Sequence, residues 1–294
     1  MPAVGLGCWM GSPGQGERCE EMVRKGLKLG YRHLDTAAGY GNEESTGKAI
    51  RESGIPRSEI FLTTKLAGPD HGRVKEAFEE SLSRLDCEYI DLYLVHWPQA
   101  EDSKGKVLQP EESPTYVETW KEMEKLLDTG KVKSIGVSNF SIKTLQVLLQ
   151  ESKIVPAVNQ VQMHPCLPQR DLMDYCSAKG IHITAYSPLG QLNSPFWTDE
   201  TVNRVAQKSG ITAAQVLLSW GVQRGTSVIP KSEKEERLKI NLAIVQLDDE
   251  DFEAIENLHK QPGMNRQLIF SNNFIGGKRA QFGWTYEQLG WEYE

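Results

Sequence analysis

Short apolar runs alternate with amphipathic stretches along most of the chain, and this alternation limits the folds that it can adopt. The runs are rich in Val, Ile, Leu and Tyr and lack strict apolar–polar alternation, which is typical of strands covered on both faces in a parallel sheet. We assign eight of them: Tyr31–Asp35, Ile60–Lys65, Ile90–His96, Val132–Ser138, Ala157–Gln162, Ile181–Ser187, Ser227–Lys231 and the least regular, Asn241–Val245.

The stretches between these runs have the spacing of amphipathic helices. They are Glu20–Leu29, Glu43–Glu52, Val74–Leu85, Tyr116–Thr129, Ser141–Glu151, Arg170–Lys179, Thr198–Lys208 and Ala213–Arg224. Ser141 is placed to cap the start of one helix, and Gly130 the end of another. Strands that alternate with helices in this number predict an α/β protein of the (β/α)₈ TIM-barrel class. Because no Pro/Gly-rich linker divides the 294 residues, we expect one domain over residues 1–294.

Three segments are longer than simple connections require: Trp97–Pro114, Pro188–Trp197 and the tail at residues 262–294. Long loops in compact domains are often functional. In a parallel barrel the active site lies at the carboxyl ends of the strands, where the first two segments begin. We therefore expect these segments to border the barrel mouth, with the C-terminal tail lying over it.

Composition excludes several classes of partner. A net charge of -7 argues against general binding to nucleic acid or to an anionic membrane surface. The five cysteines are scattered without a CxxC pair, so we expect reduced thiols and no metal site. No segment is apolar enough to span a bilayer, and Met1 leads into Pro2–Gly7 rather than into a basic and apolar leader. We expect a cytoplasmic protein that acts as a monomer.

Four polar residues follow the predicted strands in a way that directs them to one rim. Asp35, Lys65 and His96 each stand at a strand end, and Tyr40 follows Asp35 after a turn of small residues. Taken singly, a strand-end Asp or Lys is often half of a structural ion pair, and a lone His is often a core residue. Their convergence at the usual position of catalytic residues in a barrel favours an active site.

The chemistry that suits this group is proton donation by a tyrosine. A free tyrosine has a pKa of about 10 and donates poorly near neutrality, but a neighbouring lysine cation stabilises the phenolate. Lys65 is placed to do this, with Asp35 holding it charged. A neutral His96 is suited to hydrogen-bond and orient a substrate carbonyl. Trp9 and Trp97 are expected to supply apolar walls for the substrate.

Glycines are frequent at the start of the chain, from Gly5 to Gly16. No G-x-G-x-x-G follows a strand and opens a helix there, so a Rossmann domain is disfavoured and most of these glycines are expected in turns.

A candidate phosphate site follows the seventh predicted strand. Backbone amides of the turn after Ile229–Ser232 are placed to join Lys231, Ser232 and Arg237 around an anion, and loops after this strand commonly hold phosphate in TIM barrels. The alternative is a plain surface charge cluster, because Lys234, Glu235 and Glu236 are interleaved with these residues.

Four blocks of the chain together resemble the aldo-keto reductase family, from Val4 to about Leu247. They are Gly30–Ala37 with Tyr40–Glu43, Leu94–Pro98, Gly136–Phe140 and Ile229–Ser232. The resemblance implies reduction of aldehydes or ketones to alcohols, reversibly, with NADPH or NADP⁺ as cofactor and no metal. It also implies that Asp35, Tyr40, Lys65 and His96 form a catalytic tetrad with Tyr40 as the proton donor.

The same resemblance implies a set of binding residues. Those for cofactor are Trp9, Asp35, Ser138, Asn139, Gln160, Tyr186, Ser187, Pro188, Leu189, Lys231, Ser232, Arg237 and Asn241, and those for substrate are Trp9, Tyr40, His96 and Trp97. Within it, Ser138, Asn139 and Gln160 hold the nicotinamide amide and Tyr186 stacks on its ring. Lys231, Ser232 and Arg237 hold the 2′-phosphate, which favours NADPH over NADH.

Two departures from the family pattern and one further likeness refine what the resemblance implies. Ile240 stands where similar reductases often have Glu, so one contact to the adenine ribose is in question. The loop after Leu189 is short, which predicts a more open cofactor strap and faster release. Residues 109–116 resemble the fungal glycerol dehydrogenase and glyceraldehyde reductase members, so small polyol-type carbonyls such as glyceraldehyde are the favoured substrates.

Two other functions remain open from the sequence. Lys65 at a strand end also suits an aldolase that forms a Schiff base with its substrate, although such an enzyme gives no role to Ser138, Asn139 or the Lys231 cluster. A barrel that binds cofactor without turnover, as an interaction or structural protein, is the third possibility.

Overall fold

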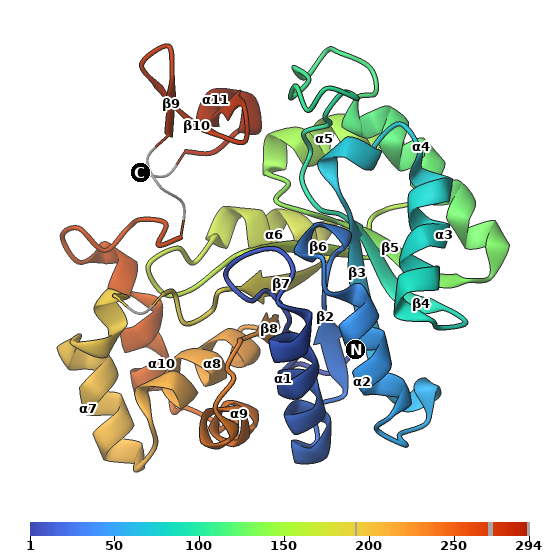
Figure 1. The fold of residues 1–294 in the computed structure, drawn as a ribbon. Coiled ribbons are helices and arrows are strands. Elements are labelled where there is room, and N and C mark those ends of the chain that lie inside the picture. The colour runs from blue at the N-terminus through green and yellow to red at the C-terminus, as the bar shows by residue number, and fades with distance from the viewer. Residues whose placement is uncertain (192, 270–272, 293–294) are drawn as a thin grey trace.

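Eight parallel strands form one sheet in which neighbours follow chain order (Figure 1). The computed structural model describes residues 1–191, 193–269 and 273–292. Its strands are β1 (Leu6–Gly7), β2 (His33–Asp35), β3 (Phe61–Leu66), β4 (Ile90–Val95), β5 (Val132–Ser138), β6 (Val158–Gln162), β7 (His182–Tyr186) and β8 (Ser227–Ile229). Val4 bridges Val228, and Gly5 N–H donates to Val228 O at 2.8 Å, so β8 returns to the start of the chain. The predicted TIM barrel is confirmed.

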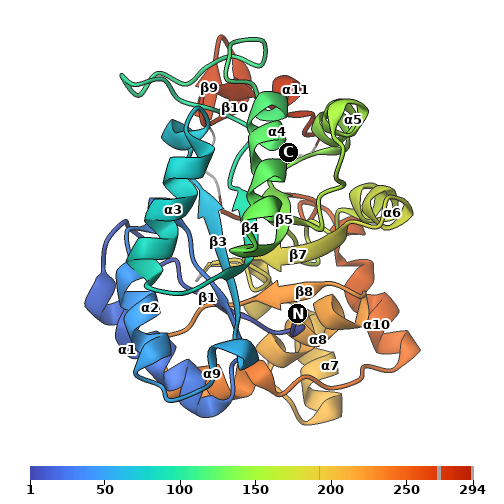
Figure 2. The same ribbon diagram turned by 90° about the vertical axis from the view of Figure 1, so that its right-hand side faces the viewer.

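Helices cover the outside of this sheet, as the two views in Figures 1 and 2 show. They are α1 (Gly16–Leu29), α2 (Glu43–Arg51), α3 (Val74–Leu85), α4 (Tyr116–Leu126), α5 (Ile142–Glu151), α6 (Arg170–Ala178), α7 (Glu200–Ser209), α8 (Ala213–Gln223), α9 (Glu235–Leu242) and α10 (Asp249–Glu256). Ser141 caps α5 through a hydrogen bond from Thr144 N, and Gly130 adopts a left-handed conformation after α4. Both predicted caps are confirmed.

The prediction of a strand at Asn241–Val245 is wrong. Asn241 lies in the last turn of α9, and the residues after it pack along α8, where Val245 N–H donates to Ser219 Oγ at 3.0 Å. The eighth strand is β1, which has only two residues and therefore lacks the apolar run by which the others are found. The apolar side chains of residues 241–245 pack against α8 and do not form part of the sheet.

The N-terminal glycines serve two purposes, of which only one was expected. Gly11 and Gly14 have φ of 92° and 84° and lie in turns, as expected. Gly7 instead lies in β1, where a Cβ would stand 2.8 Å from Ile229 O. Glycine here allows β1 to approach β8 closely enough to close the barrel.

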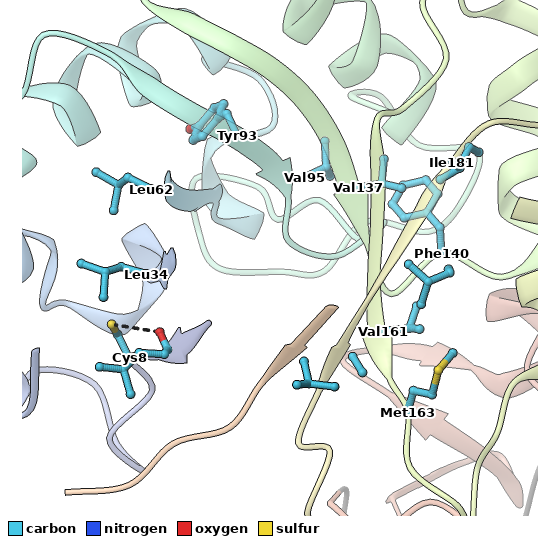
Figure 3. Close-up of a cluster of buried hydrophobic side chains, with 14 of the residues drawn as sticks. Cys8, Leu34, Leu62, Tyr93, Val95, Val137, Phe140, Val161, Met163 and Ile181 are labelled. Carbon is cyan, nitrogen blue, oxygen red and sulfur yellow. Dashed lines mark hydrogen bonds between the residues drawn. The ribbon is translucent and has the colours of Figure 1, made fainter. Parts of the chain in front are cut away.

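The apolar core has two parts, separated by the sheet. Inside the barrel, Leu92, Leu94 and Val158 pack with Phe61. The larger cluster lies between the strands and the helices, and Figure 3 shows part of it, including Leu34, Leu62, Tyr93, Val95, Val137 and Phe140. Because side chains alternate along a strand, outward-facing Leu34 and Leu62 require Asp35 and Lys65 to face the barrel interior.

The tail has structure that was not expected from the sequence. It forms a small sheet of β9 (Asn273–Ile275), β10 (Lys278–Gln281) and β11 (Trp284–Thr285), followed by α11 (Tyr286–Leu289). Trp284 Nε1 donates to Leu108 O at 2.6 Å, and Gln99 Nε2 donates to Gln281 O at 2.9 Å. The loop Trp97–Pro114 and the tail residues 273–292 are thus bonded to each other, and we call them together the cover.

No helix in the described parts of the chain combines the length and the apolar character needed to cross a membrane.

Candidate active site at the strand ends

A cavity of about 820 Å³ opens at the carboxyl ends of the strands. Of the residues predicted for the site, those that line it are Trp9, Asp35, Tyr40, His96, Trp97, Ser138, Asn139, Gln160, Tyr186, Ser187, Pro188, Leu189 and Lys231. The strand ends and the loops that follow them therefore bring most of the predicted set to one place. The size is typical of small-molecule and cofactor pockets.

Lys65 forms an ion pair with Asp35 beneath this cavity. Its Nζ donates to Asp35 Oδ1 at 2.5 Å and to Thr36 O at 2.8 Å, and the two side chains are 0% and 2% exposed. Burial lowers the pKa of Lys65, but the charge of Asp35 and the nearby Tyr40 outweigh it, so the pKa is raised overall. Lys65 is therefore a fixed cation.

Tyr40 lies beside this cation. It closes the short helix η1 (Ala38–Tyr40), a turn of small residues that returns the phenol toward the strand ends. Lys65 Nζ lies 5.0 Å from the centroid of the Tyr40 ring. Burial raises the pKa of Tyr40, and Lys65 offsets only part of that rise. The lysine acts in the expected direction, yet burial dominates, so the phenol stays protonated near neutral pH.

His96 follows β4 and faces Tyr40, with ring centroids 5.5 Å apart. Burial, followed by the Lys65 cation, holds the pKa of His96 well below its usual value of 6.5. The imidazole is neutral near pH 7, the state expected from the sequence. Trp9 also packs against Tyr40, with ring centroids 5.1 Å apart.

A hydrogen-bond network joins the ion pair to the opposite wall of the cavity. Gln160 Nε2 donates to Asp35 Oδ2 at 2.6 Å, and Ser138 Oγ donates to Gln160 O at 2.8 Å. Asn139 Nδ2 donates to His96 O at 3.0 Å, while Tyr186 Oη donates to Asn139 Oδ1 at 2.8 Å. Asn139 Nδ2 also donates to Ser138 Oγ at 3.1 Å, so these bonds form one network that holds both walls.

Backbone conformation contributes to this wall. Asn139 and Ser187 both have positive φ, of 65° and 48°, which is uncommon outside glycine and tends to occur at functional sites. Asn139 follows β5 and Ser187 follows β7. The left-handed turn at each strand end redirects the chain across the cavity.

The residues predicted to bind phosphate lie farther apart from one another than the rest of the predicted site. Lys231 lines the cavity, and Ser232 beside it is buried and accepts a hydrogen bond from Lys234 N. Arg237 is exposed on α9, and Asn241 is buried in the last turn of the same helix. The structure thus brings Lys231 to the pocket and leaves Arg237 and Asn241 farther along the α9 side.

Cys8 lines the cavity and was missed from the sequence, although it directly precedes Trp9. Thr36, whose carbonyl oxygen holds Lys65, was also missed, although it directly follows Asp35. Three further lining residues come from the segments expected to border the mouth: Gln191 and Asn193 from the loop after β7, and Phe282 from the tail.

The described residues contain no cluster of three or more His, Cys, Asp or Glu side chains able to hold a metal ion. The donors that are present suit an organic cofactor instead. Amides and hydroxyls of Ser138, Asn139 and Gln160 stand near the Tyr186 ring, and Lys231 supplies a cation farther along the same cavity.

Comparison with known proteins decides the family. A model of the Aldo/keto reductase family matches residues 3–260. The chain belongs to the aldo-keto reductase family. This confirms the resemblance seen in the sequence and the oxidoreductase class that it implied.

Relatives of this aldo-keto reductase include enzymes that are named for hydroxylated substrates. It is 42% identical to the glycerol 2-dehydrogenase (NADP(+)) of Saccharomyces cerevisiae, with 90% of each chain covered. It is also 42% identical to the D-galacturonate reductase of Hypocrea jecorina, with 87% of this chain and 86% of the other covered. Among solved structures, the Bombyx mori aldo-keto reductase in complex with NADP matches with a TM-score of 0.81 and 35% identity, covering 87% of this chain and 89% of that one.

Proposed function

We propose that this aldo-keto reductase uses NADPH to reduce aldehydes or ketones to alcohols, reversibly, with Tyr40 as the proton donor. The observation that carries the proposal is the placement of Tyr40 in the cavity beside the buried Lys65–Asp35 pair. The Lys65 ammonium group of that pair lies next to the Tyr40 phenol, which also contacts His96. Few other reactions require a protonated tyrosine, a fixed lysine cation and a neutral histidine at one point.

The opposite wall fits a nicotinamide cofactor. We assign Ser138, Asn139 and Gln160 to its amide group and the Tyr186 ring to its nicotinamide face. Ser187, Pro188 and Leu189 then follow the pyrophosphate, with Trp9 and Asp35 near the reacting end. Lys231, Ser232, Arg237 and Asn241 are assigned to the adenosine end, where the cation of Lys231 suits a 2′-phosphate. When bound, NADPH supplies the hydride.

The chain's own residues then perform the proton chemistry. His96 hydrogen-bonds the carbonyl oxygen and orients the carbonyl carbon toward the incoming hydride. As charge develops on that oxygen, Tyr40 Oη transfers its proton to it, giving the alcohol and a phenolate. Lys65 stabilises the phenolate until solvent returns the proton, and Asp35 keeps Lys65 charged and in place. Trp9 and Trp97 exclude water around the reacting carbonyl.

Small polyol-derived carbonyls, glyceraldehyde first among them, are the proposed substrates. The support is twofold. Relatives at 42% identity are named for glycerol and galacturonate, and the lining of this cavity adds the side-chain amides of Gln191 and Asn193 to its aromatic walls. Amides of this kind hydrogen-bond the hydroxyl groups that such substrates carry.

The alternatives raised by the sequence gain no support from the geometry. A Schiff-base aldolase needs a neutral lysine, whereas Lys65 is paired with Asp35 and its pKa is raised. A protein that only binds cofactor has no need for Tyr40, Lys65, Asp35 and His96 to converge. We also propose that residues 1–294 act as one domain, because the tail is bonded to the barrel's own loop.

A spectrophotometric screen tests this function. Purified protein is expected to oxidise NADPH only when a carbonyl is added, fastest with glyceraldehyde and more slowly with short ketones and aromatic aldehydes. Tight binding of NADPH without oxidation on any carbonyl would contradict the proposed reaction.

A further inference from the structure

Lys231, the cation that the cavity offers at its adenosine end, has an anionic partner two residues away. Its Nζ lies 2.6 Å from Glu233 Oε1, and the two side chains are 31% and 35% exposed. Lys231 also lines the cavity. The cation expected to meet a phosphate is therefore already paired with a carboxylate of the same turn.

A second cation holds Glu233 in that position. Arg18, on α1, donates from Nε to Glu233 Oε2 at 3.0 Å and from Nη2 to Oε1 at 2.7 Å. This two-point contact joins α1 to the segment after β8, which are neighbours because β1 and β8 close the barrel. Arg18 and then Lys231 lower the pKa of Glu233 to about 2, so the carboxylate stays charged at physiological pH.

We propose that Glu233 is a cofactor-specificity residue that weakens binding of the 2′-phosphate by occupying Lys231 and by repelling the phosphate charge. The inference rests on the proposed use of NADPH. A phosphate that approaches Lys231 must share that cation with Glu233 or displace it, and either costs binding energy. NADH has no 2′-phosphate, so the Lys231–Glu233 pair does not affect its affinity. Glu233 thus reduces the difference in affinity between NADPH and NADH. The enzyme is then able to use both cofactors.

Glu233→Gln tests the proposal by removing the charge while keeping the shape and an acceptor for Arg18. Dissociation constants are measured by titrating tryptophan fluorescence with NADPH and NADH, and by calorimetry with 2′,5′-ADP and 5′-AMP, which differ only in the 2′-phosphate. The variant is expected to bind NADPH and 2′,5′-ADP about three- to fivefold more tightly, as removal of one partly exposed charge allows. Binding of NADH and 5′-AMP is expected to change less than twofold, and high salt to shrink the gain.

Glu151→Gln is the matched control. Glu151 forms an exposed pair with Lys121 at 3.0 Å, so the variant makes the same change in net charge at α5, without touching the Lys231 pair. It is expected to leave all four constants within twofold. Glu233→Ala serves as a second variant with the same expected direction.

The outcomes separate this inference from the function on which it rests. If wild-type protein binds neither NADPH nor 2′,5′-ADP, the proposed function is overturned together with the inference. If wild-type protein binds NADPH but both Glu233 variants bind it equally or more weakly, only the inference is overturned. Equal tightening for NADPH and NADH would also overturn it, because the effect would then not involve the 2′-phosphate.

Discussion

Asp35, Tyr40, Lys65 and His96, which we call the strand-end cluster, adjoin the same cavity as the cover. The two regions are held in place by different interactions. Lys65 and Asp35 are almost fully buried and share hydrogen bonds with Thr36 and Gln160. In the cover, the contact at the cavity is between aromatic rings. The ring centroids of Phe282 and Trp97 lie 4.7 Å apart, and Phe282 is 52% exposed. The cluster is held by directional bonds between charged groups, and this part of the cover by apolar contact.

This difference assigns separate tasks to the two regions. Buried, fully bonded charges have one low-energy arrangement, because any displacement leaves a charge unpaired. Aromatic contacts at a half-exposed surface tolerate adjustment and substitution. We therefore assign the reaction to the cluster and the choice of substrate to the cover, and the following variants test that division.

Lys65→Met is expected to have the largest effect. The variant leaves Asp35 buried without its partner, which is expected to lower the free energy of unfolding by about 3–5 kcal/mol and to slow carbonyl reduction by about 10²–10⁴-fold. Urea denaturation and single-turnover kinetics measure the two effects. Lys125→Met on the surface of α4, where Lys125 pairs with Glu122, is the control and is expected to change both only slightly. If the Lys65→Met enzyme reduced carbonyls at the wild-type rate, the cluster would have no role in the reaction.

Phe282→Ala is expected to act on substrate binding alone. Loss of this ring opens the wall beside Trp97, so the KM for glyceraldehyde is expected to rise about two- to tenfold, with kcat and the Kd for NADPH within twofold. Phe274→Ala is the matched control, because Phe274 is also an exposed phenylalanine of the tail, 58% exposed, and lies on β9 outside the lining of the cavity. A fall in kcat as large as that of Lys65→Met would show that the two regions are not separable.

The pH profile is expected to show the smallest change. Reduction needs neutral His96, so activity is lost only as pH falls through the pKa of His96, which lies well below 6.5. It also needs protonated Tyr40, so activity is lost as pH rises through a pKa that burial has raised above 10. At saturating NADPH, kcat/KM is expected to vary less than about twofold between pH 6.5 and about 9. A transition near pH 6.5 that His96→Gln removes would contradict this assignment.

The sequence predicted the barrel and its rim well because both depend on local patterns. Asp35, Lys65 and His96 lie at strand ends, and parallel strands bring their ends to one edge whatever the details of packing. Strand β1 escaped detection since Leu6–Gly7 is too short to show a pattern, and its role depends on a close approach to Ile229 that only the closed barrel reveals.

Contacts between distant segments could not be predicted. The bond from Trp284 to Leu108 arises from the fold of the tail, which has no repeating apolar pattern that predicts it. The sequence placed the tail over the barrel mouth without assigning its contacts. The Arg18–Glu233 pair joins residues far apart in the chain that meet because the barrel closes. The raised pKa of Tyr40 likewise depends on burial, which a strand-end position alone does not reveal.

Tyr40→Phe gives the most direct test of the central claim. The variant keeps the ring that contacts Trp9 and His96 and removes only the hydroxyl, so the Kd for NADPH is expected to stay within twofold. Single-turnover oxidation of bound NADPH by glyceraldehyde is expected to slow by about 10²–10⁴-fold. Hydride transfer at the wild-type rate in this variant would contradict proton donation by Tyr40.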